Sequence, residues 1–384
     1  MRQRSGSWEL RVYAGRDPVS GKKRWVSRTV AGGKREAARA LAKLSAEVGG
    51  RVVAPTSATV ADLLEQWFAF ARDDFSPKTV LETRGFMDRN LLPNLGSMPL
   101  SRLGTHDVDR LYRTLRKEGA QDGGPLAPAT VRRIHGILRR ALDQGVRWNW
   151  IPANPAAAAT APRVDARELV PPAPSDVATL FALAQERDPE FATFVMLAAA
   201  TGARRSELVA LRWPAVDLEA GTVTIRGGIV IGPDGLVEKD TKTHRVRRVA
   251  LDPTTLQQLK DHLGRVVERA GACGVMLDGR AFVFSHEIDG SSSWRPDSTS
   301  RAFRRLRVRA GCEHVRLHDL RHYVATRLLV AGVDVRTVAG RLGHRNASTT
   351  LNVYAHFVAE SDRDAANVLG RLFDHATEDR TPTE

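Results

Sequence analysis

The sequence predicts three domains: a small α+β domain, an all-helical domain and a larger mixed α/β domain, mainly helical with a small antiparallel sheet. A length of 384 residues exceeds that of a typical single domain. Basic charge is concentrated at the N-terminus, where residues 1–50 hold 12 Lys and Arg but only 4 Asp and Glu. Residues 153–174, rich in proline and alanine, separate two long segments and are typical of a linker without regular packed structure.

In the N-terminal domain, Trp8–Ala14 and Arg24–Val30 alternate like strands on either side of a turn at Asp17–Gly21, and Lys34–Val48 has helical spacing. These patterns predict a hairpin or small sheet with one helix. Together with the linker they give the expected boundaries: an N-terminal domain at 1–52, a helical domain at 57–152, the linker at 153–174, the large domain at 175–374 and a tail at 375–384.

The middle domain shows helix starts at Thr59, Ser76-Pro77 and Pro128. In the last of these helices, Val131–Val146, one apolar stripe faces a core. Four arginines lie off this stripe and form either a solvated face or a face along a DNA backbone: Arg132, Arg133, Arg139 and Arg140.

The large domain begins with a buried helix at Phe191–Ala200 and a strand at Gly221–Arg226. Two further strands, Ile229–Gly232 and Arg245–Leu251, are expected to flank a turn at Pro233–Gly235. Helices are expected at Thr254–Ala270, Ser300–Ala310, Leu317–Ala331 and Asp334–Leu342.

The composition narrows the class of protein. The net charge of +14, with its N-terminal bias, favours binding of a polyanion such as nucleic acid over a charge that serves solubility alone. No run of about 18 apolar residues and no apolar signal region is present, so we expect no membrane span or secretion. With only Cys273 and Cys312, a disulfide scaffold and a structural zinc site are excluded, and a reducing cytoplasm is expected.

Two segments of the large domain carry cationic side chains suited to a phosphate. Gly202 ends the apolar helix, and Arg204 follows at the start of the next one, where a fixed cation adds to the helix dipole. Arg205 adjoins it. Lys242, expected at a hairpin, could protonate a leaving oxygen.

Two more segments carry histidines and a tyrosine. His318 and Arg321 are three residues apart and project from one face of a helix, while His322 is expected to support them or to be structural. A metal site is disfavoured because the face carries an arginine and no HExxH pattern. Gly343 ends a helix and leaves His344 in the turn, and Tyr354 is expected on a short helix beyond it.

In this order the segments resemble the catalytic domain of the tyrosine recombinases, also called the phage integrase family. The signature is T-G-x-R-x-x-E-L, a hairpin lysine, H-x-x-R-H, and L-G-H followed ten residues later by a tyrosine. Every part is present in this order, at Arg204, Lys242, His318, Arg321, His344 and Tyr354. The resemblance implies that Arg204, and not the adjacent Arg205, is the arginine of the first part, because of the spacing from Thr201-Gly202 to Glu207.

The resemblance implies a mechanism. Tyr354 would attack DNA to give a 3′-phosphotyrosine and a free 5′-hydroxyl, and Arg204 and Arg321 would bind the non-bridging oxygens. Lys242 would be the general acid, His318 a general acid/base and His344 a hydrogen-bond donor, supported by Glu207 and His322. No metal or other cofactor would be required.

The N-terminal half resembles the arm-binding and core-binding domains of phage and prophage integrases. The resemblance implies that the arm sheet enters a major groove, with Arg11, Arg24 and Arg28 as candidate contacts. The expected partners are double-stranded DNA attachment sites, a homotetramer formed on DNA from monomers or weak oligomers, and an accessory DNA-bending or directionality factor. We expect a cytoplasmic, nucleoid-associated protein.

Three alternatives remain at this point. A topoisomerase or a chromosome or plasmid resolvase could use the same catalytic fold, although resolvases generally begin directly with the helical domain. A DNA-binding regulator without catalysis is disfavoured because all six catalytic side chains are present.

Overall fold

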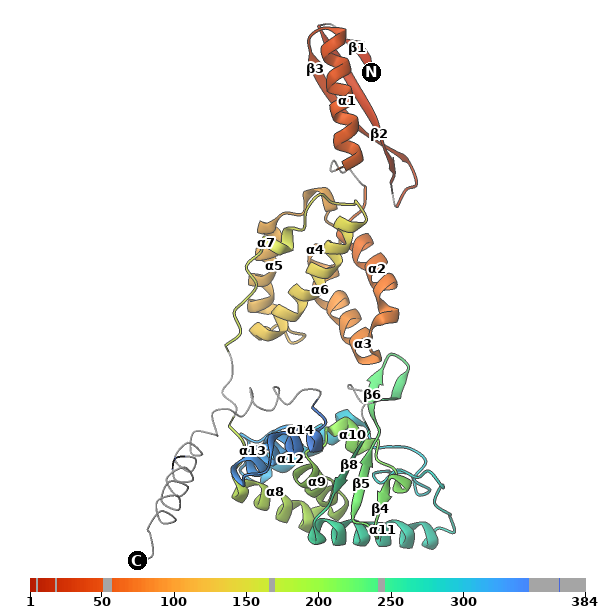
Figure 1. The fold of residues 1–384 in the computed structure, drawn as a ribbon, viewed down its shortest axis with the longest axis vertical. Helices are drawn as coiled ribbons and strands as arrows, with labels where there is room; N and C mark the ends of the chain where they lie inside the picture. Colours follow the sequence, from red (N-terminus) through yellow and green to blue (C-terminus); the bar gives the residue numbers. More distant parts are fainter. Residues whose placement is uncertain are drawn as a thin grey trace, which may run out of the picture. The chain divides into compact units, whose positions relative to one another are not determined.

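The computed structural model describes residues 1–4, 6–17, 19–50, 57–165, 170–240, 246–344 and residue 366. The chain divides into two compact units, Met1–Arg167 and Glu168–Glu384, which are described separately (Figure 1). Within the described ranges, no helix combines the length and apolar character needed to cross a membrane.

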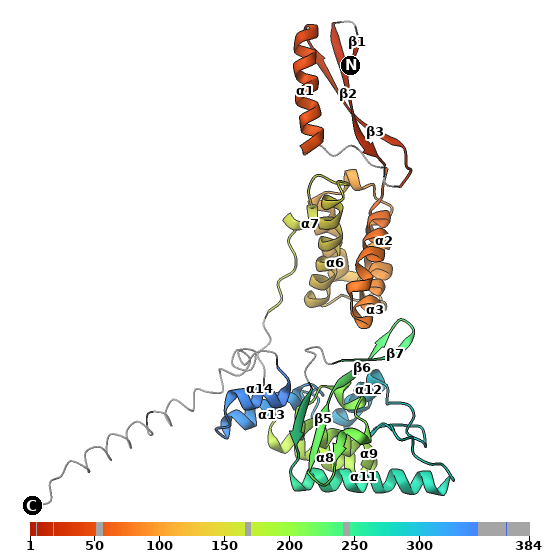
Figure 2. The same ribbon diagram turned by 45° about the vertical axis from the view of Figure 1, so that its right-hand side comes forward.

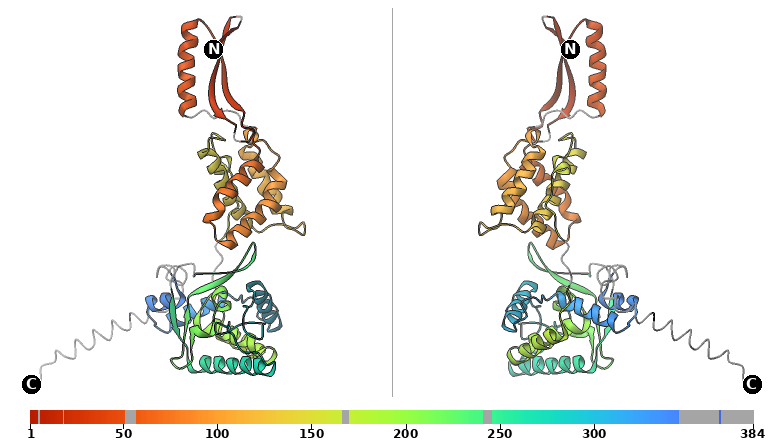
Figure 3. Two further views of the ribbon diagram at one scale, coloured as in Figure 1. Left: turned by 90° about the vertical axis from the view of Figure 1, so that its right-hand side faces the viewer. Right: turned by 90° about the vertical axis from the view of Figure 1, so that its left-hand side faces the viewer.

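The N-terminal part is an antiparallel sheet in the order β1-β2-β3, with α1 packed on one face (Figure 3). Leu10 of the sheet and Ala37 and Leu44 of the helix form its buried core. The two expected strands and the helix are confirmed, whereas β1, whose side chains are all exposed, has no apolar pattern that would reveal it. The elements are β1 (Arg2–Arg4), β2 (Ser7–Arg16), β3 (Lys23–Ala31) and α1 (Lys34–Gly50).

The middle part is entirely helical. Thr59 caps its first helix through a reciprocal capping box with Asp62, in which each side chain accepts from the other's backbone N–H. The expected stripe of the last long helix, including Val131, Ile134 and Leu138, is buried. The elements are α2 (Val60–Ala71), η1 (Arg72–Asp74), α3 (Pro77–Phe86), η2 (Met87–Leu91), α4 (Leu92–Leu95), η3 (Leu100–Arg102), α5 (Thr105–Glu118) and α6 (Pro128–Arg147).

The expectation that residues 153–174 contain no packed element is wrong in its first part. Pro155–Ala158 forms a short helix, α7, capped by Asn154, whose side chain accepts from the Ala156 N–H at 2.9 Å. Ala156 is fully buried in the core of the helical part. Proline is favoured in the first turn of a helix, and alanine is small enough to pack closely, so this composition permits a docked turn.

The second unit combines helices with the small sheet β4-β5-β8, and the two-stranded β6-β7 hairpin projects from it (Figure 2). The helix α9 is almost completely buried and contacts α8, α10, α11 and α13. The elements are α8 (Pro174–Arg187), α9 (Pro189–Thr201), α10 (Arg205–Val209), η4 (Trp213–Ala215), β4 (Val216–Asp217), β5 (Thr222–Ile225), β6 (Gly227–Gly232), β7 (Gly235–Asp240), β8 (Arg247–Ala250), α11 (Pro253–Ala272), α12 (Pro296–Arg309), α13 (Asp319–Val330) and α14 (Val335–Leu342).

The expectation that Arg245–Leu251 is the strand that flanks the turn at Pro233–Gly235 on its far side is wrong. The strand β6 pairs with β7, which follows the turn at once, whereas β8 pairs with β5. Gly232 and Gly235 face each other across a two-residue loop, the length that favours a tight hairpin. The sequence of β7 combines Leu and Val with Glu, Lys and Asp, so it lacks the apolar signal of a buried strand.

Candidate active site

The site begins where α9 ends. Gly202 has a left-handed backbone (φ 64°), and a Cβ placed there would lie 2.4 Å from Cδ2 of Leu342 in α14. Only glycine therefore allows this close approach. The Gly202 carbonyl accepts a hydrogen bond of 2.7 Å from Nη1 of Arg321 in α13. One turn thus joins α9, α13 and α14.

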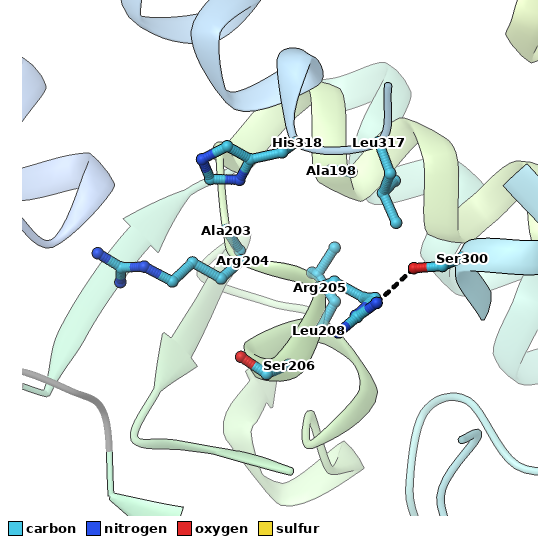
Figure 4. A pocket seen from close by; sticks show the side chains of 9 residues that line it. All are labelled: Ala198, Ala203, Arg204, Arg205, Ser206, Leu208, Ser300, Leu317 and His318. Carbon is cyan, nitrogen blue, oxygen red and sulfur yellow. Dashed lines mark hydrogen bonds between the residues drawn. The ribbon is translucent and has the colours of Figure 1, made fainter. Parts of the chain in front are cut away.

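Two consecutive arginines after this turn point in different directions (Figure 4). Arg204 is the N-cap residue of α10 and extends along the His318 side of a cavity of about 280 Å³. Arg205 points the other way and donates to the Ser300 hydroxyl of α12. The fold therefore places Arg204 beside His318 and Arg205 between α10 and α12.

Glu207 lies beneath Arg204 and is 4% exposed. Its carboxylate accepts from the Arg204 backbone N–H at 2.9 Å and from Arg204 Nη1 at 2.7 Å. Burial by itself raises the pKa of Glu207, but the hydrogen bond and charge of Arg247, helped by Arg204, hold that pKa below its ordinary value. Glu207 is therefore a carboxylate that orients Arg204.

His318 immediately precedes α13, and Arg321 lies in the first turn of that helix, where its N–H donates to the His318 carbonyl at 3.1 Å. The helix begins two residues later than expected, yet both side chains belong to the same short segment. Arg321 is 4% exposed. Burial lowers the pKa of His318, and the charges of Arg321 and Arg204 lower it further, against the effect of Asp319.

Two more histidines complete the described part of the site. The His322 ring lies edge-on to His318, with 5.0 Å between ring centres. His344 follows Gly343, whose left-handed conformation (φ 68°) ends α14 as expected. Burial lowers the pKa of His344 to about 4, assisted by the charges of Arg321 and Arg204. The pKa of His322 is also lowered to about 4, mainly by burial and in addition by the charge of His318.

These histidines predict a pH dependence of stability. Because the folded pKa values of His322 and His344 are about 4 against an ordinary 6.5, the unfolded chain binds protons that the folded chain excludes. The free energy of unfolding should be fully retained above pH 6.5 and should fall as the pH decreases toward 4. Urea unfolding at pH 7.5, 6 and 5 measures this, and the slope should flatten in His322→Gln/His344→Gln. An equal slope in both proteins would contradict the expectation.

The structure thus brings together Arg204, Glu207, His318, Arg321, His322 and His344. Lys242 and Tyr354 lie outside the described residues. Their roles remain predictions from the sequence.

One buried residue of the site was missed. Arg247, the first residue of β8, places Nη2 2.5 Å and Nη1 3.3 Å from the two carboxylate oxygens of Glu207. Arg247 lies two residues before the buried Val249, so in a strand both side chains project from the same face, and this is the one signal that the sequence offered. An inward arginine requires a buried acid, and that acid lies 40 residues away in the chain.

The arm arginines do not share one face. Cross-strand partners project from the same face of a sheet, so Arg28, paired with Leu10, lies on the α1 side and forms an ion pair of 2.9 Å with Glu47. Arg11 lies on the open face, with its guanidinium 5.1 Å from the Trp25 ring centre. Arg24 precedes Trp25 and therefore lies on the α1 side. Arg11 thus lies on the face that α1 leaves open, and the DNA contacts of all three arginines stay predictions.

The four arginines of α6 are exposed and off the buried stripe, as the pattern predicts. Arg133 forms an ion pair of 2.6 Å with Glu82, and the Arg132 side chain donates to the Pro162 carbonyl at 3.2 Å. Arg140 donates from Nε to the Gly136 carbonyl at 3.0 Å. This face is basic and accessible, which is compatible with both a solvated face and a face along a DNA backbone.

The chemistry of the site is that of an anion-binding centre. Arg204 and Arg321 supply planar guanidinium groups that match phosphate oxygens, and the neutral histidines supply a donor or acceptor beside them. Among the described residues no group of three His, Cys, Asp or Glu side chains has the placement of a metal centre. The arrangement is suited to an anion such as a phosphate group, held by fixed cations.

Comparison with known proteins places this site in a family. Residues 173–360 match the phage integrase family, and residues 59–115 match the phage integrase N-terminal SAM-like domain. The chain therefore belongs to the phage integrase family, whose members include the tyrosine recombinases.

Two curated relatives cover most of the chain. A tyrosine recombinase XerC-like protein of Caldanaerobacter subterraneus subsp. tengcongensis is 25% identical over 343 residues, which are 82% of this chain and 83% of the relative. The ICEBs1 integrase of Bacillus subtilis is 23% identical over 370 residues, 96% of this chain and 98% of the relative.

Two solved structures share the fold. The Tn1549 transposon integrase in complex with a circular intermediate DNA matches with a TM-score of 0.66 and 23% identity, over 81% of this chain and 99% of that one. A lambda integrase tetramer bound to a Holliday junction matches with a TM-score of 0.59 and 18% identity, over 87% and 90%. The expected fold class is confirmed.

Proposed function

We propose that this protein is a site-specific DNA recombinase that integrates and excises a phage, prophage or integrative element. The observation that supports this most is the placement of Arg204 and Arg321 beside three histidines, with the Gly202 turn joining the segments. Such a site is suited to a phosphodiester that becomes more negative as a nucleophile attacks.

In the proposed reaction the Tyr354 oxygen attacks a phosphorus atom of DNA, forming a phosphotyrosine bond while the bond to the 5′-oxygen breaks. Lys242 gives its proton to that oxygen, and the proton of Tyr354 passes to His318. Arg204, Arg321 and His344 hold the non-bridging oxygens throughout. Attack of a 5′-hydroxyl on the phosphotyrosine reverses the same steps, so the energy of the original bond is retained for rejoining.

The proposed substrate is a double-stranded attachment site. The Tn1549 integrase was solved with a circular intermediate DNA and the lambda integrase as a tetramer on a Holliday junction, which supports DNA binding and a tetramer on DNA here. We also propose an accessory DNA-bending or directionality factor and association with the nucleoid, because recombination acts on chromosomal DNA.

The N-terminal α+β domain favours an integrase over a resolvase. Its open sheet face carries Arg11, with the partly exposed rings of Tyr13 and Trp25 beside it, and residues 1–50 are strongly basic. A cation and aromatic rings on one sheet face are suited to a DNA groove. We propose that residues 1–52 bind arm sites, that residues 57–152 bind the core site and that residues 175–374 carry catalysis.

Metal removal tests the mechanism. The full chain should form a covalent complex with a nicked duplex of the core attachment site, mapped as the direct repeat at the two ends of the element. Because arginine and lysine meet the phosphate charge, the yield in 10 mM EDTA should be within about twofold of that in magnesium. Denaturing gels of labelled DNA measure the yield. Loss in EDTA with recovery in magnesium would count against the mechanism.

Deletion of residues 1–50 tests the proposed arm. The small core around Leu10 is formed within these residues, so the rest of the chain should stay folded. Cleavage of a duplex with only the core site should persist, while recombination between full attachment sites should fall by at least about 100-fold, since the arm contacts add several phosphate interactions. Full recombination by the truncated chain would favour the resolvase alternative.

A further inference from the structure

Arg247 is a buried arginine with three separate contacts. Its side chain is 7% exposed. The terminal nitrogens face both carboxylate oxygens of Glu207, and Nε donates to the Arg341 carbonyl at 2.9 Å. A buried guanidinium is costly unless such partners satisfy it, so its position is well defined.

Through Glu207, Arg247 acts on Arg204. Each carboxylate oxygen of Glu207 accepts one hydrogen bond from Arg247 and one from Arg204. Arg204 donates from its backbone N–H and from one guanidinium nitrogen, Nη1. Because Arg247 makes the bidentate contact with the Glu207 carboxylate, Arg204 contacts it through only one guanidinium nitrogen. If Arg247 were absent, the buried carboxylate would attract the whole fork of Arg204 and turn it from the cavity.

Through α14, Arg247 acts on His344. The Arg341 carbonyl that it binds belongs to the last turn of this helix. At Gly343, a Cβ would lie 2.7 Å from Nη1 of Arg247, so the guanidinium packs directly against the turn. His344 is the next residue. The arginine therefore holds the backbone that carries this histidine.

We propose that Arg247 is a positioning residue that sets Arg204 and His344 against one phosphate at the same time, an inference that rests on the function proposed above. A lysine could balance the charge of Glu207, but its single nitrogen cannot span the carboxylate and the Arg341 carbonyl in one plane. Arg247→Lys should therefore keep the fold and lose the alignment.

Arg248 provides a matched control. It is the next residue of β8, and its exposed side chain pairs with Asp217 and Thr222. We would compare Arg247→Met and Arg247→Lys with Arg248→Met and Arg248→Lys in the full chain, measuring melting temperature, DNA affinity by gel shift, and the single-turnover cleavage rate of the nicked core-site duplex at saturating protein.

The Arg247 variants should bind DNA within about threefold of their Arg248 counterparts yet cleave roughly 100-fold more slowly, because displacement of about 1 Å has effects of this size. If the melting temperature of Arg247→Met is well below that of Arg248→Met, the cleavage rate of Arg247→Lys is the measurement that tests the proposal. Cleavage by Arg247→Lys at the rate of Arg248→Lys would overturn the proposal.

A second substrate separates alignment from general damage. A methylphosphonate at the scissile position lacks one negative oxygen and so demands less of Arg204. The deficit of the Arg247 variants should shrink on this substrate, as that of Arg204→Ala should. An equal deficit on both substrates would overturn the proposal. Failure of wild-type protein and of the Arg248 variants to cleave would contradict the proposed function itself.

Discussion

Tyr354→Phe should form no covalent complex with DNA while binding the core site with an affinity within about twofold of wild type. The substitution removes only the phenolic oxygen, which the proposed reaction uses as its nucleophile. An ordinary tyrosine has a pKa near 10, so at neutral pH it depends on neighbouring cations to become reactive. No other side chain in the proposed mechanism forms a bond to phosphorus, so the expected loss is complete.

The measurement is a denaturing gel of a labelled nicked duplex, with affinity from a gel shift on the intact duplex. Tyr323, four residues after Asp319 and outside the proposed reaction, offers a control, since Tyr323→Phe should leave covalent-complex formation within a few-fold of wild type. Covalent complex or recombination by Tyr354→Phe would remove Tyr354 from its proposed role.

Arg204→Lys should lower the cleavage rate by about 10²- to 10³-fold, the usual effect of removing one fixed donor from a developing charge. Lysine keeps the positive charge but cannot contact Glu207 and a phosphate through one planar group. Arg321→Lys should have an effect of the same order, because it also loses the bond to the Gly202 carbonyl. Since Arg321 is buried and Arg204 is partly exposed, the melting temperature should fall more for Arg321→Lys.

Arg205→Ala is the informative comparison. Its side chain links α10 to Ser300 of α12, so the variant should lose stability but keep cleavage within about tenfold of wild type. Single-turnover rates and thermal melts on the same preparations measure both effects. If Arg205→Ala slowed cleavage as much as Arg204→Ala, the assignment of the two arginines would be wrong.

Much of the fold was predictable because its signals are local. Strand alternation revealed β2 and β3, and capping residues such as Thr59 marked where helices begin. Two predictions failed where the local signal was weak or misleading. The strand β7 carries charged residues and was overlooked, so the turn at Pro233–Gly235 was assigned the wrong second strand. The turn α7 was overlooked because its prolines suggested a linker, although proline suits the start of a helix.

From the amino-acid sequence one can predict which side chains are suited to the chemistry and on which local elements they lie. Arg204 after a glycine turn, His318 with Arg321, and His344 after Gly343 all follow from interactions within a few residues. The order of these segments was specific enough to indicate the family.

How these segments meet depends on the tertiary fold. The fold places Arg204 on the side of His318 and Arg205 against Ser300. It pairs Arg28 with Glu47, leaves Arg11 on the open face of the sheet, and brings Arg247 to Glu207. These outcomes depend on contacts between residues far apart in the chain, where packing and the need to pair each buried charge select the arrangement. Local patterns contain no information about such partners, because the partner of a buried arginine is set by the elements that the fold places beside it.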